Sequence, residues 1–138
     1  MGDAELITRI KKSLSKITVP VADVPSDASL LTGYCKIEGE SEPLNFVIKA
    51  KDGYSTIYMI APYSAEAFKN ENFYQELAAV NLRLAKGHFN ADAGTMRLIY
   101  KWVLPAVHFE GNCDELVKEF IILPAAMIFK YKANFVKS

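Results

Sequence analysis

The sequence predicts an α+β fold in which an antiparallel sheet of about five strands packs against helices. Apolar residues with helical spacing occur near both ends of the chain and in its middle. The stretches between these helices alternate apolar and polar residues, as half-buried strands do. Asp52-Gly53, the strongest short hairpin signal, joins two of the strands. The resulting element order is α-β-β-β-α-β-β-α.

Composition points to one domain spanning residues 1–138. Sixteen basic side chains balance sixteen acidic ones, so no net charge draws the chain to nucleic acid or anionic lipid. Two cysteines, Cys35 and Cys113, supply neither a disulfide framework nor a four-ligand zinc site. The N-terminal stretch lacks the apolar region of a signal peptide, and the longest apolar run, residues 120–129, is too short to span a bilayer. We therefore expect a cytoplasmic protein with no membrane span.

The first helix is predicted over residues 3–17, where Asp3 can cap its start. One stripe of this helix is apolar at helical spacing and faces the core: Leu6, Ile7, Ile10, Leu14 and Ile17. Pro20 and Pro25 prevent the helix from continuing, so residues 18–27 are predicted to form an extended connector.

Three strands follow the connector. Residues 30–38 and 44–50 alternate, and the third strand begins after Asp52-Gly53 and ends at Pro62. A two-residue type I′ turn fixes the register, which opposes Lys51 to Tyr54, Ile48 to Ile57 and Phe46 to Met59. One face of this hairpin is therefore apolar, while the other carries basic, polar and branched residues.

A second helix is predicted from about Ser64, and Gly87 stops it. Its core stripe is Phe73, Leu77, Val80 and Leu84. A short strand and a turn at Asp92-Ala93-Gly94 lead into a long alternating strand that Pro105 closes. The inward row of that strand is Met96, Leu98, Tyr100, Trp102 and Leu104.

The last helix is predicted to begin at Asn112, with Glu115 completing a capping box. Pro124 should kink or split it. The helix is apolar well beyond one stripe, so we expect a second subunit to cover part of it. The dimer-interface candidates are Ile121, Ile122, Ile128 and Phe129.

Two stretches carry a family resemblance. They are Asn81-Leu-Arg-Leu-Ala-Lys-Gly-His-Phe and Leu-Ile-Tyr-Lys-Trp-Val-Leu-Pro105, separated by a short acidic turn. They resemble the helix-end Asn, the Gly-x-Phe strand start and the aromatic strand closed by Leu-Pro in the YbjN family of bacterial proteins. The fold of that family is similar to type III secretion chaperones. The resemblance implies no catalytic residues, and it implies a non-enzymatic regulator or chaperone-like dimer.

The residues themselves offer little catalytic chemistry. His108-x-Glu110-x-x-Cys113 could supply metal ligands, but no Pro-Cys-x-x-Cys follows and no further ligand cluster completes a zinc site. We expect no metal, no cofactor and no catalytic residues, and we expect Cys35 to be a small buried side chain. Asn81 is expected to be a structural cap at a helix end.

The polar face of the sheet is the more informative surface. Basic residues alternate there with aromatic and branched ones, and Thr56 lies among them. The partner-binding candidates on this face are Tyr34, Lys36, Val47, Lys49, Tyr58, Arg97, Ile99, Lys101 and Val103. Ordinary strand propensity explains such a pattern. A docking face for an acidic, apolar protein segment also explains it, and that segment is either a client or the chain's own residues 38–42.

The sequence therefore predicts a non-catalytic protein-binding module, chaperone-like or a regulatory adaptor, that acts as a homodimer. A nucleic-acid-binding module is the alternative, because tyrosines stack on bases and lysines hold phosphates. The balanced net charge disfavours nucleic acid. An enzyme or metal protein centred on His108, Glu110 and Cys113 is a third hypothesis.

Overall fold

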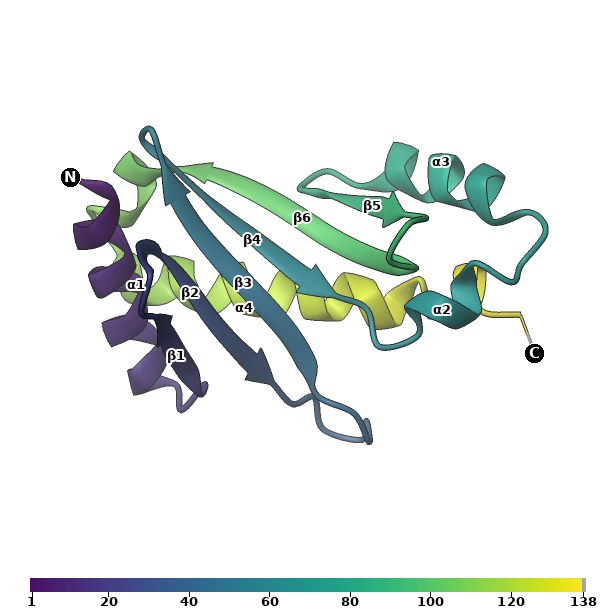
Figure 1. Cartoon of the computed structure of the whole chain (residues 1–138), viewed down its shortest axis with the longest axis horizontal. Helices are drawn as coiled ribbons and strands as arrows, with labels where there is room; N and C mark the ends of the chain where they lie inside the picture. The colour runs from purple at the N-terminus through teal and green to yellow at the C-terminus, as the bar shows by residue number, and fades with distance from the viewer. Residues whose placement is uncertain (138) are drawn as a thin grey trace.

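A computed structural model describes residues 1–137 of the chain. The helices are α1 (Asp3–Lys16), α2 (Ser64–Ala67), α3 (Phe73–Arg83), α4 (Cys113–Lys130) and α5 (Lys132–Phe135), with a 3-10 turn η1 (Ala106–Phe109). The strands are β1 (Val21–Val24), β2 (Asp27–Cys35), β3 (Leu44–Lys51), β4 (Tyr54–Ile60), β5 (His88–Asp92) and β6 (Arg97–Pro105). In Figure 1, α4 runs behind the sheet and α1 lies beside β1 and β2.

The sheet is antiparallel throughout, in the order β1-β2-β3-β4-β6-β5, which confirms the predicted α+β class. It has six strands rather than about five, because part of the predicted connector pairs with β2 as strand β1. Pro20 and Pro25 flank this strand without interrupting it, and proline is tolerated at a sheet edge. Gly33 makes the pairing possible, since a Cβ there would lie 2.7 Å from the carbonyl oxygen of Pro20.

The hairpin between β3 and β4 has the predicted register. Lys51 faces Tyr54, Ile48 faces Ile57 and Phe46 faces Met59. Asp52 and Gly53 have φ angles of 50° and 83°, both positive as a type I′ turn requires. This register sorts the side chains of both strands between the two faces of the sheet.

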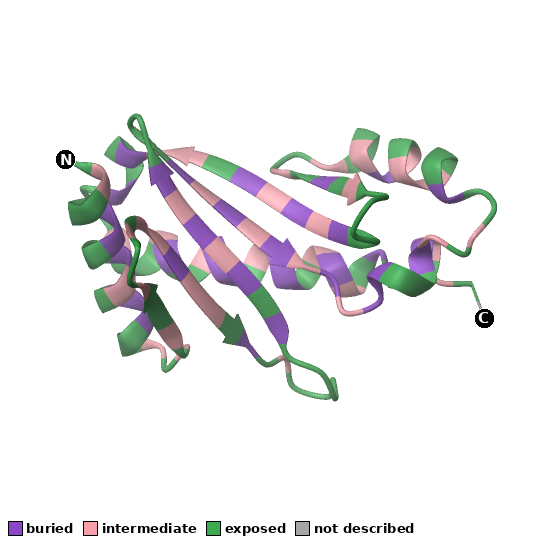
Figure 2. Cartoon of the chain, in the orientation of Figure 1, coloured by how far each residue is buried: buried purple, intermediate pink, exposed green. Residues whose placement is uncertain are grey.

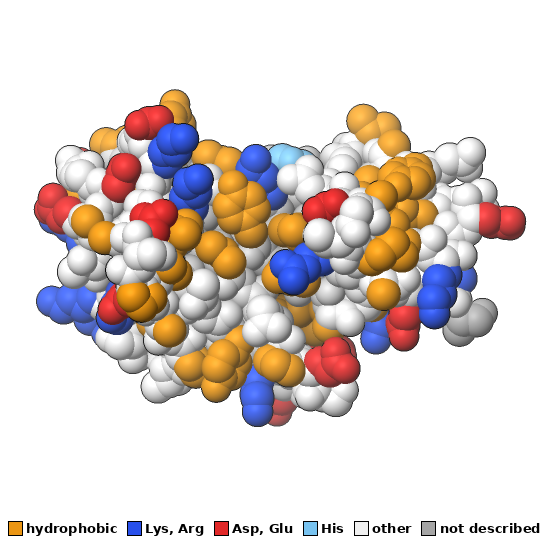
Figure 3. Space-filling view, viewed as in Figure 1, with side chains coloured by type: hydrophobic (Ala, Val, Ile, Leu, Met, Phe, Trp, Pro, Cys, Tyr) orange, Lys and Arg blue, Asp and Glu red, His pale blue; other side chains and the backbone are white. Residues whose placement is uncertain are grey.

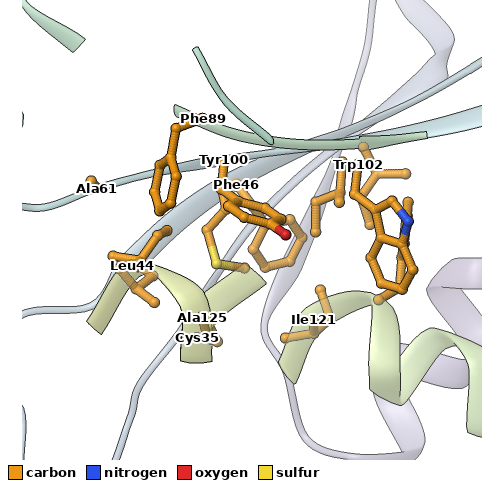
Figure 4. Packing of buried hydrophobic residues seen from close by; sticks show 14 of the residues in the cluster. Cys35, Leu44, Phe46, Ala61, Phe89, Tyr100, Trp102, Ile121 and Ala125 are labelled. Atoms are coloured by element: carbon orange, nitrogen blue, oxygen red, sulfur yellow. The ribbon is translucent and has the colours of Figure 1, made fainter. Parts of the chain in front are cut away.

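The core lies between one face of the sheet and the helices α1 and α4. Buried and less buried residues alternate along the strands in Figure 2. Figure 4 shows sheet side chains, among them Tyr100 and Trp102, pointing toward α4 at Ile121. Met96 was wrongly predicted to start the inward row of β6, since it lies in the preceding turn with a φ of 56° and is 41% exposed. The buried row begins at Leu98.

The middle helical segment forms two helices instead of one. The chain turns between α2 and α3, where the Asn70 side chain accepts a hydrogen bond from the Asn72 backbone N–H at 3.0 Å. Phe73 and Val80 are buried as predicted, while Leu77 and Leu84 pack partly buried against the core. α3 ends at Arg83, so Gly87 does not terminate it. Gly87 instead adopts a φ of 68° in the turn before β5.

α4 passes through Pro124 without a break, which contradicts the predicted split. Pro124 is buried, and core packing around it offsets the roughly 3 kcal/mol that proline costs inside a helix. The helix ends at Lys130 with Tyr131 as its C-cap, and in its last turn the Ile128 carbonyl accepts a hydrogen bond from the Tyr63 hydroxyl at 2.6 Å. Asn112 is the N-cap residue but makes no side-chain capping bond.

Two smaller expectations about helix surfaces are also corrected. Asp3 is the first helical residue, and Gly2 takes the N-cap position. Ile121 and Ile128 are 4% and 0% exposed, so they belong to the core of this chain and are not interface residues. Ile121 faces the side chains of the sheet (Figure 4), and Tyr63 contacts the backbone at Ile128. Ile122, at 50% exposure, and the partly buried Phe129 stay interface candidates.

Candidate partner-binding face of the sheet

Among residues 1–137, no helix covers the face of the sheet opposite α4 (Figure 1), and we call it the open face. It includes the nine predicted partner-binding residues and Thr56, and none of these ten side chains is buried. The nine lie on β2, β3, β4 and β6, except Lys36, which directly follows β2. The register therefore brings residues from four strands onto one surface. Their role in binding stays a prediction.

Register partners form rows across the open face. Thr32, Val47, Tyr58 and Lys101 are successive partners on β2, β3, β4 and β6. In the next row, roughly 7 Å further along the strands, Tyr34 pairs with Asn45 and Ile60 pairs with Ile99. Each row therefore mixes polar or basic side chains with aromatic or branched ones.

Four basic side chains, Lys36, Lys49, Arg97 and Lys101, give the open face its charge. Within residues 1–137, none of them forms an ion pair. The Lys101 ammonium lies 5.7 Å from the Tyr58 ring centroid, a cation–π contact between register partners. Figure 3 shows basic and hydrophobic side chains side by side over the sheet.

The basic residues contribute to lowering the pKa of two carboxylates near the margins of the open face. The pKa of Asp27 is lowered mainly by hydrogen bonds from Ser29, with a smaller contribution from Lys49. The pKa of Asp92, the register partner of Arg97, is lowered mainly by hydrogen bonding with Thr95. Neither acid neutralises the four basic residues by direct pairing.

A groove of about 410 Å³ runs across β1 to β4 and is referred to below simply as the groove. It is lined by Pro20, Val21, Ala22, Thr32, Gly33, Tyr34, Asn45, Phe46, Val47 and Ile60. Sequence reasoning found Tyr34 and Val47 but missed the wall formed by β1, which it had assigned to a connector. The available signal was Gly33, because a glycine inside an alternating strand often marks a close backbone approach.

The Asn81 side chain closes one edge of the sheet. Its amide nitrogen donates to the Phe89 carbonyl at 3.0 Å, and its oxygen accepts from the Phe89 N–H at 2.8 Å. The sequence predicted a structural cap at a helix end. The structure shows that Asn81 instead caps the outer backbone of β5, as a neighbouring strand would.

The structure also bears on the metal-site hypothesis, on Cys35 and on a membrane span. In the part of the chain that the structure describes, no group of three His, Cys, Asp or Glu side chains could hold a metal ion, and this includes His108, Glu110 and Cys113. Burial raises the pKa of the Cys35 thiol to about 11, so this cysteine stays protonated. No helix within residues 1–137 is long and apolar enough to cross a membrane.

The acidic loop at residues 38–42 does not cover the open face. Glu40 and Glu42 instead line a small polar pocket with Glu66, Phe129 and Lys132. The hypothesis that the chain's own loop occupies the docking face is therefore wrong, because the loop packs toward α2 and the end of α4.

Comparisons with known proteins define the fold but not the family. No protein-family model matches the sequence. No curated protein matches it either. Among solved structures, a chain from the crystal structure of the ExsC–ExsE complex is similar, with a TM-score of 0.69 at 9% sequence identity. The match covers 97% of this chain and 96% of that chain. It supports the α+β fold over nearly the whole chain, whereas the likeness to type III secretion chaperones and membership of the YbjN family stay predictions.

Proposed function

We propose that the protein is a non-catalytic protein-binding module, a chaperone-like or regulatory adaptor, that holds its partner on the open face. The observation that carries the proposal is a sheet face that, within residues 1–137, bears no helix and has four basic residues without ion-pair partners beside apolar ones. The fold likeness adds support, because the similar chain comes from the crystal structure of a complex, that of ExsC with ExsE. We also propose a cytoplasmic location, which suits two free cysteines.

Co-purification from the protein's own host tests this proposal. The tagged wild-type protein is compared with the double variant Lys49→Glu and Lys101→Glu on the open face. A matched control reverses two exposed lysines on helices, Lys12→Glu with Lys118→Glu, and so changes the net charge equally. We expect one protein partner with the wild type and the control, and its loss from the open-face variant. Equal recovery by all three proteins would contradict the proposal.

We further propose that the protein forms a homodimer. The most exposed apolar stripe is on α3, where Tyr74, Ala78 and Leu82 follow one another at four-residue spacing. Tyr74 and Leu82 are 61% and 89% exposed, more than Ile122 on α4. Such a stripe is typical of an interaction surface. A second copy can cover it by packing its own α3 stripe against it.

Light scattering on the purified protein tests the homodimer. We expect a dimer for the wild type and a monomer for Leu82→Glu, with Ile122→Glu as the comparison for α4. A monomeric wild type at micromolar concentration would refute self-association. A monomer produced by Ile122→Glu alone would move the interface to α4.

Nucleic-acid binding is the second candidate, favoured by the contact between Lys101 and Tyr58 on the open face. It predicts salt-sensitive RNA binding that the variant Lys49→Glu with Lys101→Glu abolishes. Absence of RNA binding by the wild type at low salt would end this alternative.

A further inference from the structure

We propose that the groove binds an apolar side chain of an extended partner segment that carries acidic residues on both sides of that anchor. This inference rests on the proposed protein-binding function and specifies the chemistry of the partner. Three features of the structure support it: the origin of the groove, the charges that flank it, and the closed edges of the sheet.

The groove exists because residue 33 is glycine. A Cβ on Gly33 would lie 2.6 Å from the Phe46 ring and 2.9 Å from the Val21 side chain. Without that Cβ, β1 closes against β2 and contributes the apolar walls Pro20 and Ala22. The groove is thus part of the packing of this fold, and its predominantly apolar lining suits an apolar side chain.

Two adjacent register rows form the walls across the strands. One row contains Ala22, Thr32 and Val47, and the other contains Tyr34 and Asn45. The rows are roughly 7 Å apart along the strands. An extended segment laid over the groove can therefore place an aliphatic or aromatic side chain between them.

Basic residues flank the groove beyond both walls. Lys49 lies two residues past Val47 on β3, and Lys36 lies two residues past Tyr34 on β2. Lys49 pairs with Leu30, so the two lysines are separated by six residues of strand, roughly 20 Å. Carboxylates on either side of an apolar anchor match the positions of these two lysines.

The sheet edges offer no comparable site for strand addition. On the β5 edge, the Asn81 side chain already hydrogen-bonds the backbone N–H and carbonyl of Phe89. On the opposite edge, Pro20 and Pro25 flank the four-residue strand β1, and Asp23 is held by Lys11 at 2.7 Å. Short edges bracketed by proline resist pairing with another strand. The open face is therefore the better receptor for an extended partner.

Fluorescence polarisation with synthetic peptides tests the inference. The probe is a short labelled peptide in which leucine alternates with glutamate. One matched peptide replaces glutamate by lysine, and another replaces leucine by serine. The proteins are the wild type, Lys36→Glu with Lys49→Glu, Val47→Ser in the groove wall, and the control Lys12→Glu with Lys118→Glu. Circular dichroism melting confirms that each variant is folded, and Lys36→Gln with Lys49→Gln replaces the reversal if that variant is not.

The wild type and the control should bind the glutamate–leucine peptide, with affinity falling as salt rises. Reversal of the two lysines should weaken binding by at least about tenfold, and Val47→Ser should weaken it severalfold without changing the salt dependence. The lysine and serine peptides should bind weakly. Equal binding of the lysine peptide, no binding of the acidic peptide, or displacement of the peptide by single-stranded RNA would overturn the inference.

The co-purified partner separates this inference from the proposed function. If the Lys36→Glu and Lys49→Glu variant retains the natural partner, the protein-binding function stands and the groove assignment fails. If the wild type has no protein partner at all, the proposed function itself fails.

Discussion

Replacing Asn81 by alanine tests the closure of the β5 edge. The substitution removes two hydrogen bonds, one to the Phe89 carbonyl and one from the Phe89 N–H. A hydrogen bond contributes about 0.5–1.5 kcal/mol net. Because Asn81 is half-buried, water can partly replace it, so we expect a loss of about 1–2 kcal/mol in the free energy of unfolding. With roughly 0.29 kcal/mol/K of unfolding entropy for a chain of 138 residues, Tm falls by about 3–7 °C.

Urea denaturation measures the free energy, and hydrogen exchange at Phe89 locates the effect. Asn90→Ala is the matched control. Asn90 follows Phe89 on β5, is exposed, and its side chain makes no hydrogen bond within the described residues. The control should be within about 0.5 kcal/mol of the wild type. Equal stability of Asn81→Ala and Asn90→Ala, or unchanged exchange at Phe89, would refute the proposed closure. Concentration-dependent association of Asn81→Ala alone would further support it, since an uncapped edge pairs with other chains.

Three further predictions concern contacts elsewhere in the chain. Tyr63→Phe leaves the buried Ile128 carbonyl without its donor and should cost about 1–3 kcal/mol in urea denaturation; unchanged stability would show that the bond contributes nothing. Gly33→Ala should displace β1 and lower the free energy of unfolding by about 1–3 kcal/mol, with faster hydrogen exchange at Val21 to Val24. Gly111→Ala is the control, because a Cβ there has open space, and it should change neither measurement. The pKa of Asp114 is lowered first by the Ser13 hydroxyl and then by Lys16. Its stabilising contribution is therefore present above the unfolded value of 3.8 and is lost as pH falls through the lower folded pKa. Asp114→Asn should flatten the stability profile below about pH 4, and an unaltered acid profile would contradict this.

Local sequence patterns were sufficient for most of the sheet. Asp52-Gly53 fixed the register of β3 and β4, because a two-residue turn leaves one pairing, and period-two alternation then assigned the open face. β1 could not be found in this way. The sequence signal for β1 is that residue 33 is glycine. A side chain there would clash with Pro20 and Val21, and a local alternation pattern does not reveal that contact.

The helices show the same limit. The apolar excess of α4 suggested a second subunit, but Ile121 and Ile128 are buried within this chain. Pro124 suggested a break that core packing overrides, and Tyr63 binds the Ile128 carbonyl in the last turn of the helix. Such outcomes depend on which elements meet in three dimensions, which helical spacing alone does not determine. The groove escaped prediction for the same reason, since one wall belongs to β1.

Site-specific photo-crosslinking in the protein's own host tests most directly whether the open face binds a protein partner. A photoreactive residue is placed at Tyr34 or at Val103, both exposed on the open face, and at Ala126, exposed on α4, as the control. The predicted result is the same heavier protein adduct from Tyr34 and Val103 and no adduct from Ala126. An adduct from Ala126 alone, or crosslinks from the open face to RNA instead of protein, would contradict the assignment of the open face as the partner-binding surface.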